Sequence, residues 1–335
     1  MTPDLQSQKT RALCELAPVI PVLVVADAAR AEGLATALVA GGLPVLEVTL
    51  RTPAALDVIR EMSRVAGGHV GAGTVLTPDD AKRAKDAGAS FAVSPGATEQ
   101  IVRACSDIEL PLLAGAVTAS EVMRAMEWGY SMLKFFPAEA AGGAKSLKSL
   151  AGPLPQVSFC PTGGVTPGNA RDYLALSNVI CVGGSWISPD ADVAAGNWAA
   201  IEARARDARH AARLAPQVEA VAINANRNAE AYAAFGYPLL PDLLPDYPGP
   251  LGGFHAALSA SPQPLVMLVP CDSPDFPADL VARLRHALLE ADAEVAETFA
   301  IASEAFGFDV ADVVGGSRDL RKTKGRGHGL LDSTC

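Results

Sequence analysis

The chain has few of the features that mark several large classes of protein. Its six cysteines are scattered over 335 residues without a C-x-x-C pair, which argues against a disulfide framework or a zinc site and favours a reduced, cytoplasmic setting. Its first apolar run, residues 18–25, is too short to span a membrane, and no signal-peptide cleavage pattern follows it. Because the formal net charge is -10 and no basic stripe precedes the last twenty residues, nucleic acid is not an expected partner.

A regular alternation of apolar runs and helical patterns fills the first half of the chain. Half of all residues are hydrophobic, enough for a large core, and the length suggests two domains. Near-continuous apolar runs predict parallel strands covered on both faces, at residues 19–25, 45–49, 69–75, 90–93, 112–115, 131–136, 157–161 and 179–182. Strands alternating with helices in this way predict an α/β fold, a (β/α)8 TIM barrel. An open doubly wound sheet is the alternative, disfavoured because no G-x-G-x-x-G follows the first strand.

The pattern changes near residue 187. One Ala/Arg-rich helix is expected over 191–215, followed by a second and smaller α/β unit. That unit has predicted strands at 218–223 and 265–269 and a predicted helix at 277–290. The end of the chain is basic, Gly-rich and aperiodic, which predicts disorder. The expected divisions are residues 1–205, residues 206–297 and a tail at 298–335.

Lys134 is a single ammonium in an otherwise apolar strand, SMLKFF, at residues 131–136. A desolvated lysine loses its proton more readily and can attack a ketone to form a Schiff base. The alternative is a lysine near a strand end that extends its charge to water. The strand taken alone favours this second interpretation slightly.

Other polar residues fall at the carboxyl ends of predicted strands, where barrels of this class carry their active sites. Glu47 and Arg51 end the second strand, where a carboxylate could move protons and a guanidinium could bind a carboxylate, or the two could form a structural ion pair at the rim. Glycines after the seventh and eighth strands predict a phosphate cradle made of backbone N–H groups, although tight turns also require glycine. These cradle residues are Gly163, Gly164, Gly184 and Ser185.

Together these residues describe a Schiff-base lyase that acts on a phosphorylated keto acid. The iminium would be the electron sink, so no metal or cofactor is needed, and the chain has no H-x-x-x-H or H-E-x-x-H pattern for a metal-dependent aldolase. The alternative is a phosphate-binding barrel of another class, such as an isomerase, in which Lys134 would act only through its charge.

Six segments of the barrel resemble the motifs of 2-dehydro-3-deoxy-6-phosphogluconate (KDPG) aldolase, and the resemblance runs in order over about residues 10–205. They are LEVTLRT (46–52), GAGTVL (71–76), FAVSPG (91–96), LKFFPAE (133–139), PTGGV (161–165) and VGGSW (182–186). The family performs the lyase step of the Entner–Doudoroff pathway and often also cleaves 4-hydroxy-2-oxoglutarate. The resemblance implies a class I aldolase that forms homotrimers.

The resemblance also assigns roles to individual residues. It implies that Lys134 is the Schiff-base lysine and Glu47 the general acid/base. The pyruvate end would be lined by Arg51, Thr74, Pro95, Phe136 and Thr162. The phosphate would be held by Gly163, Gly164, Gly184 and Ser185.

The second unit resembles the middle of molybdenum cofactor guanylyltransferase, a different family. The similar segments are AINANR (222–227), LPDLLPDYPGPLGG (240–253) and VPCDSPDFPADLVARL (269–284). The resemblance implies that Asp272 would help to hold Mg²⁺ and that Asn224, Asn226 and Asp246 would lie near a guanine nucleotide, GTP. The Gly-rich loop with Arg and Lys that opens this family is missing, so we interpret the segment as truncated, with Mg²⁺ and GTP needed only if it is active.

Overall fold

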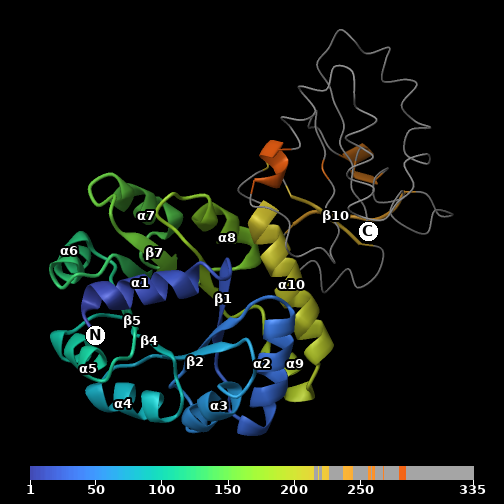
Figure 1. Ribbon diagram of the computed structural model, residues 1–335. Helices are drawn as coiled ribbons and strands as arrows, with labels where there is room; N and C mark the ends of the chain where they lie inside the picture. Colours follow the sequence, from blue (N-terminus) through green and yellow to red (C-terminus); the bar gives the residue numbers. More distant parts are fainter. Residues whose placement is uncertain are drawn as a thin grey trace. The chain divides into compact units, whose positions relative to one another are not determined.

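The computed structural model describes residues 1–214 and, beyond them, residues 218, 221–225, 237–243, 256–257, 259–260, 267 and 279–283 (Figure 1). The chain divides into two compact units, Met1–Pro216 and Gln217–Cys335. Within residues 1–216 the described chain is an eight-stranded parallel sheet closed into a barrel and surrounded by helices, as the sequence predicts.

Each strand of the barrel follows the previous one around the ring. The strands are β1 (Val19–Leu23), β2 (Val45–Thr49), β3 (His69–Gly73), β4 (Phe91–Val93), β5 (Leu112–Gly115), β6 (Met132–Phe135), β7 (Ser158–Pro161) and β8 (Val182–Gly184). The sheet order is β7-β6-β5-β4-β3-β2-β1-β8, and bridges from Phe159 to Val179 and from Thr162 to Gly183 join its two ends. Strand β8 therefore begins later than the sequence predicts, because residues 179–181 approach β7 before the chain pairs with β1.

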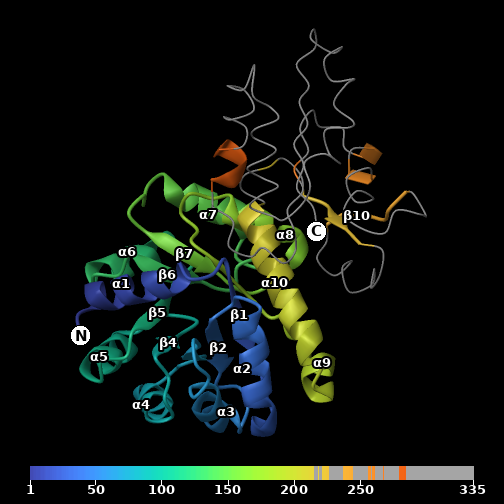
Figure 2. The ribbon, with the colours of Figure 1, turned by 45° about the vertical axis from the view of Figure 1, so that its right-hand side comes forward.

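Helices surround the barrel between the strands (Figures 1 and 2). They are α1 (Pro3–Cys14), α2 (Ala31–Ala40) preceded by a short 3-10 turn (Ala28–Arg30), α3 (Ala55–Met62), α4 (Pro78–Asp86), α5 (Glu99–Asp107), α6 (Ala119–Glu127), α7 (Gly143–Ala151), α8 (Pro167–Leu174), α9 (Asp190–Ala195) and α10 (Trp198–Leu214). Threonine caps with a reciprocal carboxylate start α4 and α6, at Thr77 and Thr118. Such caps fix where a helix begins, and so where the preceding strand must end.

Helix α1 is absent from the sequence prediction, and it closes the amino-terminal end of the barrel. Its buried Gln6 accepts hydrogen bonds from the backbone N–H of Leu112 and from the hydroxyl of Tyr130. Ser7 accepts from the N–H of Ser131, at the start of β6. Because α1 is bound by these polar side chains, the apolar periodicity that predicts a packed helix is weak there.

The single helix predicted over 191–215 is wrong. Gly196 adopts a left-handed conformation, with φ of 71°, and ends α9, after which α10 begins at Trp198. Glycine adopts this conformation at little cost, and it commonly terminates helices for that reason. The Ala-rich composition on both sides hides this break in the sequence.

The described part of the second unit is small. Strands β9 (Ile223–Asn224) and β10 (Leu239–Leu240) pair in parallel, and the side chain of Asn224 donates to the carbonyl oxygen of Leu240 and to Asp242. Strand β9 overlaps the end of the predicted strand at 218–223. Most of the predicted helix at 277–290, most of the strand at 265–269 and the whole tail at 298–335 lie outside the described residues.

Candidate active site

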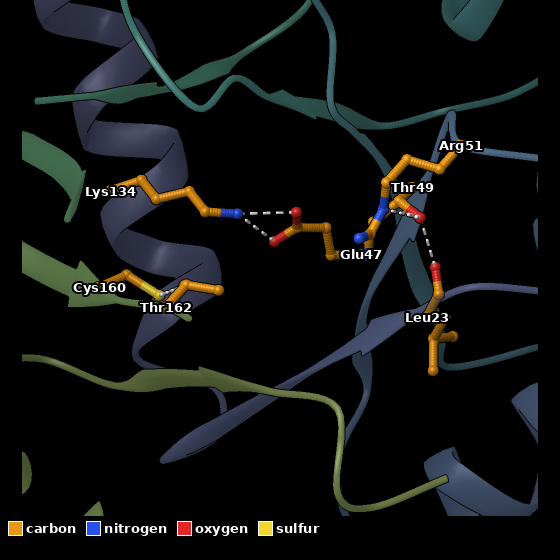
Figure 3. A network of polar contacts seen from close by, with 7 residues as sticks. All are labelled: Leu23, Glu47, Thr49, Arg51, Lys134, Cys160 and Thr162. Atoms are coloured by element: carbon orange, nitrogen blue, oxygen red, sulfur yellow. Dashed lines mark hydrogen bonds and ion pairs between the residues drawn. The ribbon is translucent and has the colours of Figure 1, made fainter. Parts of the chain in front are cut away.

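Lys134 and Glu47 meet across the interior of the barrel. Strands β6 and β2 are four positions apart in a closed ring of eight, so they lie on opposite sides. The Nζ atom of Lys134 lies 2.8 Å from Oε1 and 3.1 Å from Oε2 of Glu47 (Figure 3). Inward-pointing residues of alternate strands share one layer of such a barrel, which explains why two even-numbered strands supply the pair.

The pair is almost completely removed from water. Lys134 is 5% exposed and Glu47 is 4% exposed. Burial of either charge alone would be very unfavourable, so each group depends on the other. The interpretation of Lys134 as a lysine that extends to solvent is therefore wrong. The ring of Phe136 also faces the ammonium, with its centroid 5.5 Å from Nζ, close enough for a cation–π interaction.

Strand β3 fits closely against the carboxylate. A Cβ atom added to Gly73 would lie 2.4 Å from Oε1 of Glu47, so only glycine allows the carboxylate to reach its position. The next residue, Thr74, has a φ of 61°, an unfavourable conformation for a β-branched side chain. Backbone strain of this kind is concentrated at functional sites.

Arg51 belongs to the same rim but does not pair with Glu47. Its Nε donates to Oγ1 of Thr49 at 3.2 Å, and Thr49 in turn donates to the carbonyl oxygen of Leu23 on β1 (Figure 3). The structural ion pair between Glu47 and Arg51, one alternative from the sequence, is therefore not formed. Arg51 is exposed, so its guanidinium is open to an anionic ligand.

Two further predicted residues lie at strand ends around the pair. Thr162 is buried directly after β7 and forms a bridge with Gly183 of β8. Pro95 follows β4, and its carbonyl would lie 2.3 Å from a Cβ added to Gly115 of β5. These close backbone contacts bring the ends of β4, β5, β7 and β8 to the same face of the barrel as Lys134.

The predicted phosphate cradle occupies the ends of β7 and β8. Gly163 and Gly164 have φ values of 96° and 77°, which a residue with a side chain adopts only at a cost. Gly184 lies under the ring of Trp186, where an added Cβ would overlap ring carbons. Ser185 is exposed. Of the three glycines, Gly164 is exposed, Gly163 is half-buried and Gly184 is buried.

A group of three thiols lies beneath the pair, and the sequence reasoning missed it. Cys160, the register partner of Lys134, belongs to one buried cluster with Cys14 of α1 and Cys181. A hydrogen bond with Cys160 raises the pKa of the Cys14 thiol, and one with Cys14 raises the pKa of Cys181. Both thiols are therefore neutral in the core. The described residues contain no His, Cys, Asp and Glu grouping that could hold a metal ion.

Comparison with known families agrees with this geometry. Residues 10–204 match the family model described as KDPG and KHG aldolase. The chain belongs to this family. It is therefore an aldehyde-lyase of the KDPG aldolase type. Residues 204–308 match a second model, the MobA-like NTP transferase domain, as the sequence of the second unit predicts.

Curated relatives resemble this aldolase over its first 200 residues or so. The KHG/KDPG aldolase of Escherichia coli (strain K12) is 50% identical over 198 residues, which are 59% of this chain and 93% of that protein. The 2-dehydro-3-deoxy-phosphogluconate aldolase of Pseudomonas aeruginosa is 48% identical over 197 residues, 58% of this chain and 90% of that protein.

Solved structures agree in fold. A Legionella pneumophila KDPG aldolase, with pyruvate captured as a covalent carbinolamine, is 44% identical and superposes with a TM-score of 0.58, covering 59% of this chain and 97% of that one. The 2-keto-3-deoxy-6-phosphogluconate aldolase of Zymomonas mobilis ZM4, with 3-phosphoglycerate, is 47% identical with a TM-score of 0.56, covering 59% and 95%.

Sequence reasoning could have found some of the supporting residues of this aldolase. Thr49 is two residues from Glu47 on one strand, so the alternation of a strand places both on one face. Gly73, by contrast, gives no sequence signal of its role, since its importance depends on a side chain from another strand. Of the residues predicted near a nucleotide, Asn224 is described, and Asn226, Asp246 and Asp272 lie outside the described residues.

Proposed function

We propose that this aldolase cleaves 2-dehydro-3-deoxy-6-phosphogluconate to pyruvate and glyceraldehyde 3-phosphate, and 4-hydroxy-2-oxoglutarate to pyruvate and glyoxylate. The observation that carries the proposal is the buried contact of 2.8 Å between Lys134 and Glu47 at the carboxyl ends of two opposite strands. A lysine kept from water, with a carboxylate beside it, is suited to Schiff-base chemistry. The relatives' names and the pyruvate carbinolamine of the Legionella aldolase support the same substrates.

The reaction begins at the ketone. Lys134 gives a proton to Glu47, and its free amine attacks C2 of the substrate to form a carbinolamine. Glu47 returns the proton to the C2 hydroxyl, which leaves as water, so that a protonated imine forms and Glu47 is again a carboxylate. Glu47 then takes the proton of the C4 hydroxyl. The C3–C4 bond breaks, its electrons move toward the iminium nitrogen, and the aldehyde leaves. The remaining enamine takes the proton from Glu47 at C3, and water then hydrolyses the imine, which releases pyruvate and restores the lysine.

The other predicted residues bind and orient the substrate in this proposal. Arg51 binds the carboxylate of the pyruvate portion, because its guanidinium is exposed at the rim and its Nε is fixed by Thr49. Thr74, Pro95, Phe136 and Thr162 line that end of the site. Backbone N–H groups of Gly163, Gly164 and Gly184, with the hydroxyl of Ser185, bind the phosphate. The iminium serves as the electron sink, so the cleavage requires neither metal nor cofactor.

Borohydride reduction in the presence of pyruvate tests the assignment of Lys134. The expected result is a stable adduct on the peptide that contains Lys134, with loss of activity in a lactate dehydrogenase-coupled assay for pyruvate release. Borohydride without pyruvate is the control. Full activity without any adduct at Lys134 would contradict the Schiff-base mechanism and would favour a barrel in which the lysine acts only through its charge.

A second function is supported by the match of residues 204–308 to the MobA-like NTP transferase domain. We propose that residues 206–297 form a truncated unit that binds a guanine nucleotide with Mg²⁺, with Asp272 as a metal ligand. Titration of the full chain with GTP, with and without Mg²⁺, tests this. Saturable binding that requires Mg²⁺ and is lost in Asp272→Ala is expected, and the absence of saturable binding would rule out this function.

We also propose a homotrimer in the cytoplasm. Two large apolar side chains, Val24 and Leu76, are 44% and 55% exposed just after β1 and β3, which flank β2. Exposed apolar groups at neighbouring strand ends suit a contact between copies. Light scattering after size exclusion should give three times the 34.5 kDa of one chain, and the mass of one chain would refute the trimer. No described helix has both the length and the apolar character needed to cross a membrane.

A further inference from the structure

Glu139 connects the loop after β6 to the predicted phosphate cradle. It lies five residues after Lys134 in the LKFFPAE segment. Its backbone N–H donates to the carbonyl oxygen of Gly163 at 3.1 Å. A Cβ added to Gly164 would lie 2.7 Å from both Cβ and Cγ of Glu139. The side chain of Glu139 therefore lies directly against the backbone of the second cradle glycine.

Tyr173 holds the side chain of Glu139 through a hydrogen bond. Its hydroxyl donates a hydrogen bond to Oε1 of Glu139. Tyr173 belongs to α8, which follows the cradle loop in the chain, and its side chain is fully buried. Burial, together with the neighbouring carboxylate, raises the pKa of Tyr173, so the hydroxyl keeps its proton and acts as the donor. The hydrogen bond thus joins the two segments that enclose the glycines.

The Gly163–Gly164 loop needs such support from outside. Both glycines have positive φ, and neither has a side chain that could fix the loop by packing. Asn169 of α8 donates from Nδ2 to the carbonyl oxygen of Gly164 at 3.1 Å. Glu139 lies against the same residue through its Cβ and Cγ. The Lys134–Glu47 pair is fixed separately, by its own contacts across the barrel.

We propose that Glu139, held by Tyr173, is a positioning residue that sets the Gly163–Gly164 loop for the substrate's phosphate and so determines the preference for phosphorylated over unphosphorylated keto acids. This rests on the proposed aldolase function and on the cradle within it. Because Glu139 is itself an anion, it acts through the glycine backbone and is not a ligand of the phosphate. Cleavage of 4-hydroxy-2-oxoglutarate, which has no phosphate, does not use this support.

Three variants separate positioning from charge. Glu139→Ala removes the support; because this side chain is exposed, the change leaves the core packing intact. Tyr173→Phe removes only the hydrogen bond, and Glu139→Gln removes the charge but keeps an oxygen that accepts from the tyrosine hydroxyl. Glu32→Ala, which removes an exposed carboxylate on α2, is the matched control.

The test compares kcat and KM for the phosphorylated six-carbon substrate and for 4-hydroxy-2-oxoglutarate. In Glu139→Ala and Tyr173→Phe, KM for the phosphorylated substrate should rise about fivefold to tenfold, the effect of one hydrogen bond of ordinary strength. Because 4-hydroxy-2-oxoglutarate has no phosphate, its kcat and KM should change less than about twofold, which corresponds to roughly 0.4 kcal/mol. In Glu139→Gln, KM for the phosphorylated substrate should stay close to that of the unaltered protein.

Two outcomes would overturn the proposal. Equal losses on both substrates in Glu139→Ala would mean that Glu139 only maintains the fold. A lower KM for the phosphorylated substrate in both Glu139→Ala and Glu139→Gln would mean that its charge merely repels phosphate. Failure of the aldolase function would look different, since the unaltered protein would then form no borohydride adduct with pyruvate and cleave neither substrate.

Discussion

Removing Lys134 alone should destabilise the barrel strongly, and removing its partner as well should restore most of the loss. The perturbation is Lys134→Met, which keeps an unbranched side chain, shorter by one atom, and deletes its charge. Glu47, which is 4% exposed in the unaltered protein and lies closely against Gly73, is then left with no cation beside its carboxylate. An uncompensated buried charge is among the most unfavourable changes that a core can undergo.

The magnitude follows from the burial. Breaking a buried ion pair by removing one partner costs about 3–5 kcal/mol. For a domain of this size, each kcal/mol lowers Tm by about 2–4 °C, so a decrease of roughly 6–20 °C is expected. The double variant Lys134→Met with Glu47→Gln leaves no buried charge, and it should be more stable than the single Lys134→Met variant by at least about 2 kcal/mol.

Urea denaturation followed by tryptophan fluorescence measures these differences in the barrel alone. All three tryptophans lie within the first 205 residues, at Trp128, Trp186 and Trp198. The second unit therefore contributes no tryptophan signal, and the full chain can be used. A Lys134→Met variant within about 1 kcal/mol of the unaltered protein would refute the reasoning. So would a double variant that is no more stable than the single one.

Three further predictions concern neighbouring parts of the barrel. Gly73→Ala should lower pyruvate release at least about tenfold, because the added Cβ would lie 2.4 Å from Oε1 of Glu47, whereas Gly152→Ala, with open space around it, should leave activity unchanged. Tyr130→Phe should reduce the free energy of unfolding by about 1 kcal/mol in urea titrations, since it deletes the hydrogen bond to the glutamine of α1. Burial raises the pKa of Asp207 to about 6, above the value of about 3.9 in an unfolded chain. The folded barrel thus binds that proton more tightly than the unfolded chain does. The free energy of unfolding should therefore decrease as the pH rises from about 4 to about 6, and Asp207→Asn should remove this contribution to the decrease.

The barrel could be predicted from the sequence because its signals are local. Each strand is a short apolar run, and threonine or glycine marks many helix ends, so the predicted strands β2 and β5 agree with the observed bounds. Helix α1 was missed because it packs through polar side chains such as Gln6 and Ser7. Hydrophobic periodicity cannot detect a helix whose buried face is polar.

The site was only partly predictable, because its arrangement depends on contacts between distant strands. A lysine in an apolar run identified Lys134, and strand ends identified Glu47 and Arg51 as neighbours. Which two of them pair depends on the closure of the barrel, since β2 faces β6 only in a ring of eight strands. The supporting role of Gly73 likewise cannot be read without the side chain that lies against it.

Stability does not account for the buried pair. Replacing a buried ion pair by apolar side chains of similar volume is often neutral, or stabilising by about 1–4 kcal/mol, so an ordinary core would contain neither Lys134 nor Glu47. The surroundings of the pair also include a strained Thr74, a glycine held against the carboxylate and an aromatic ring facing the ammonium. Each of these features is unfavourable or contributes little to stability. Together they hold the lysine and the carboxylate in contact and away from water. The proposed Schiff-base mechanism accounts for the arrangement, because it requires a lysine and a carboxylate in contact beside a bound keto acid.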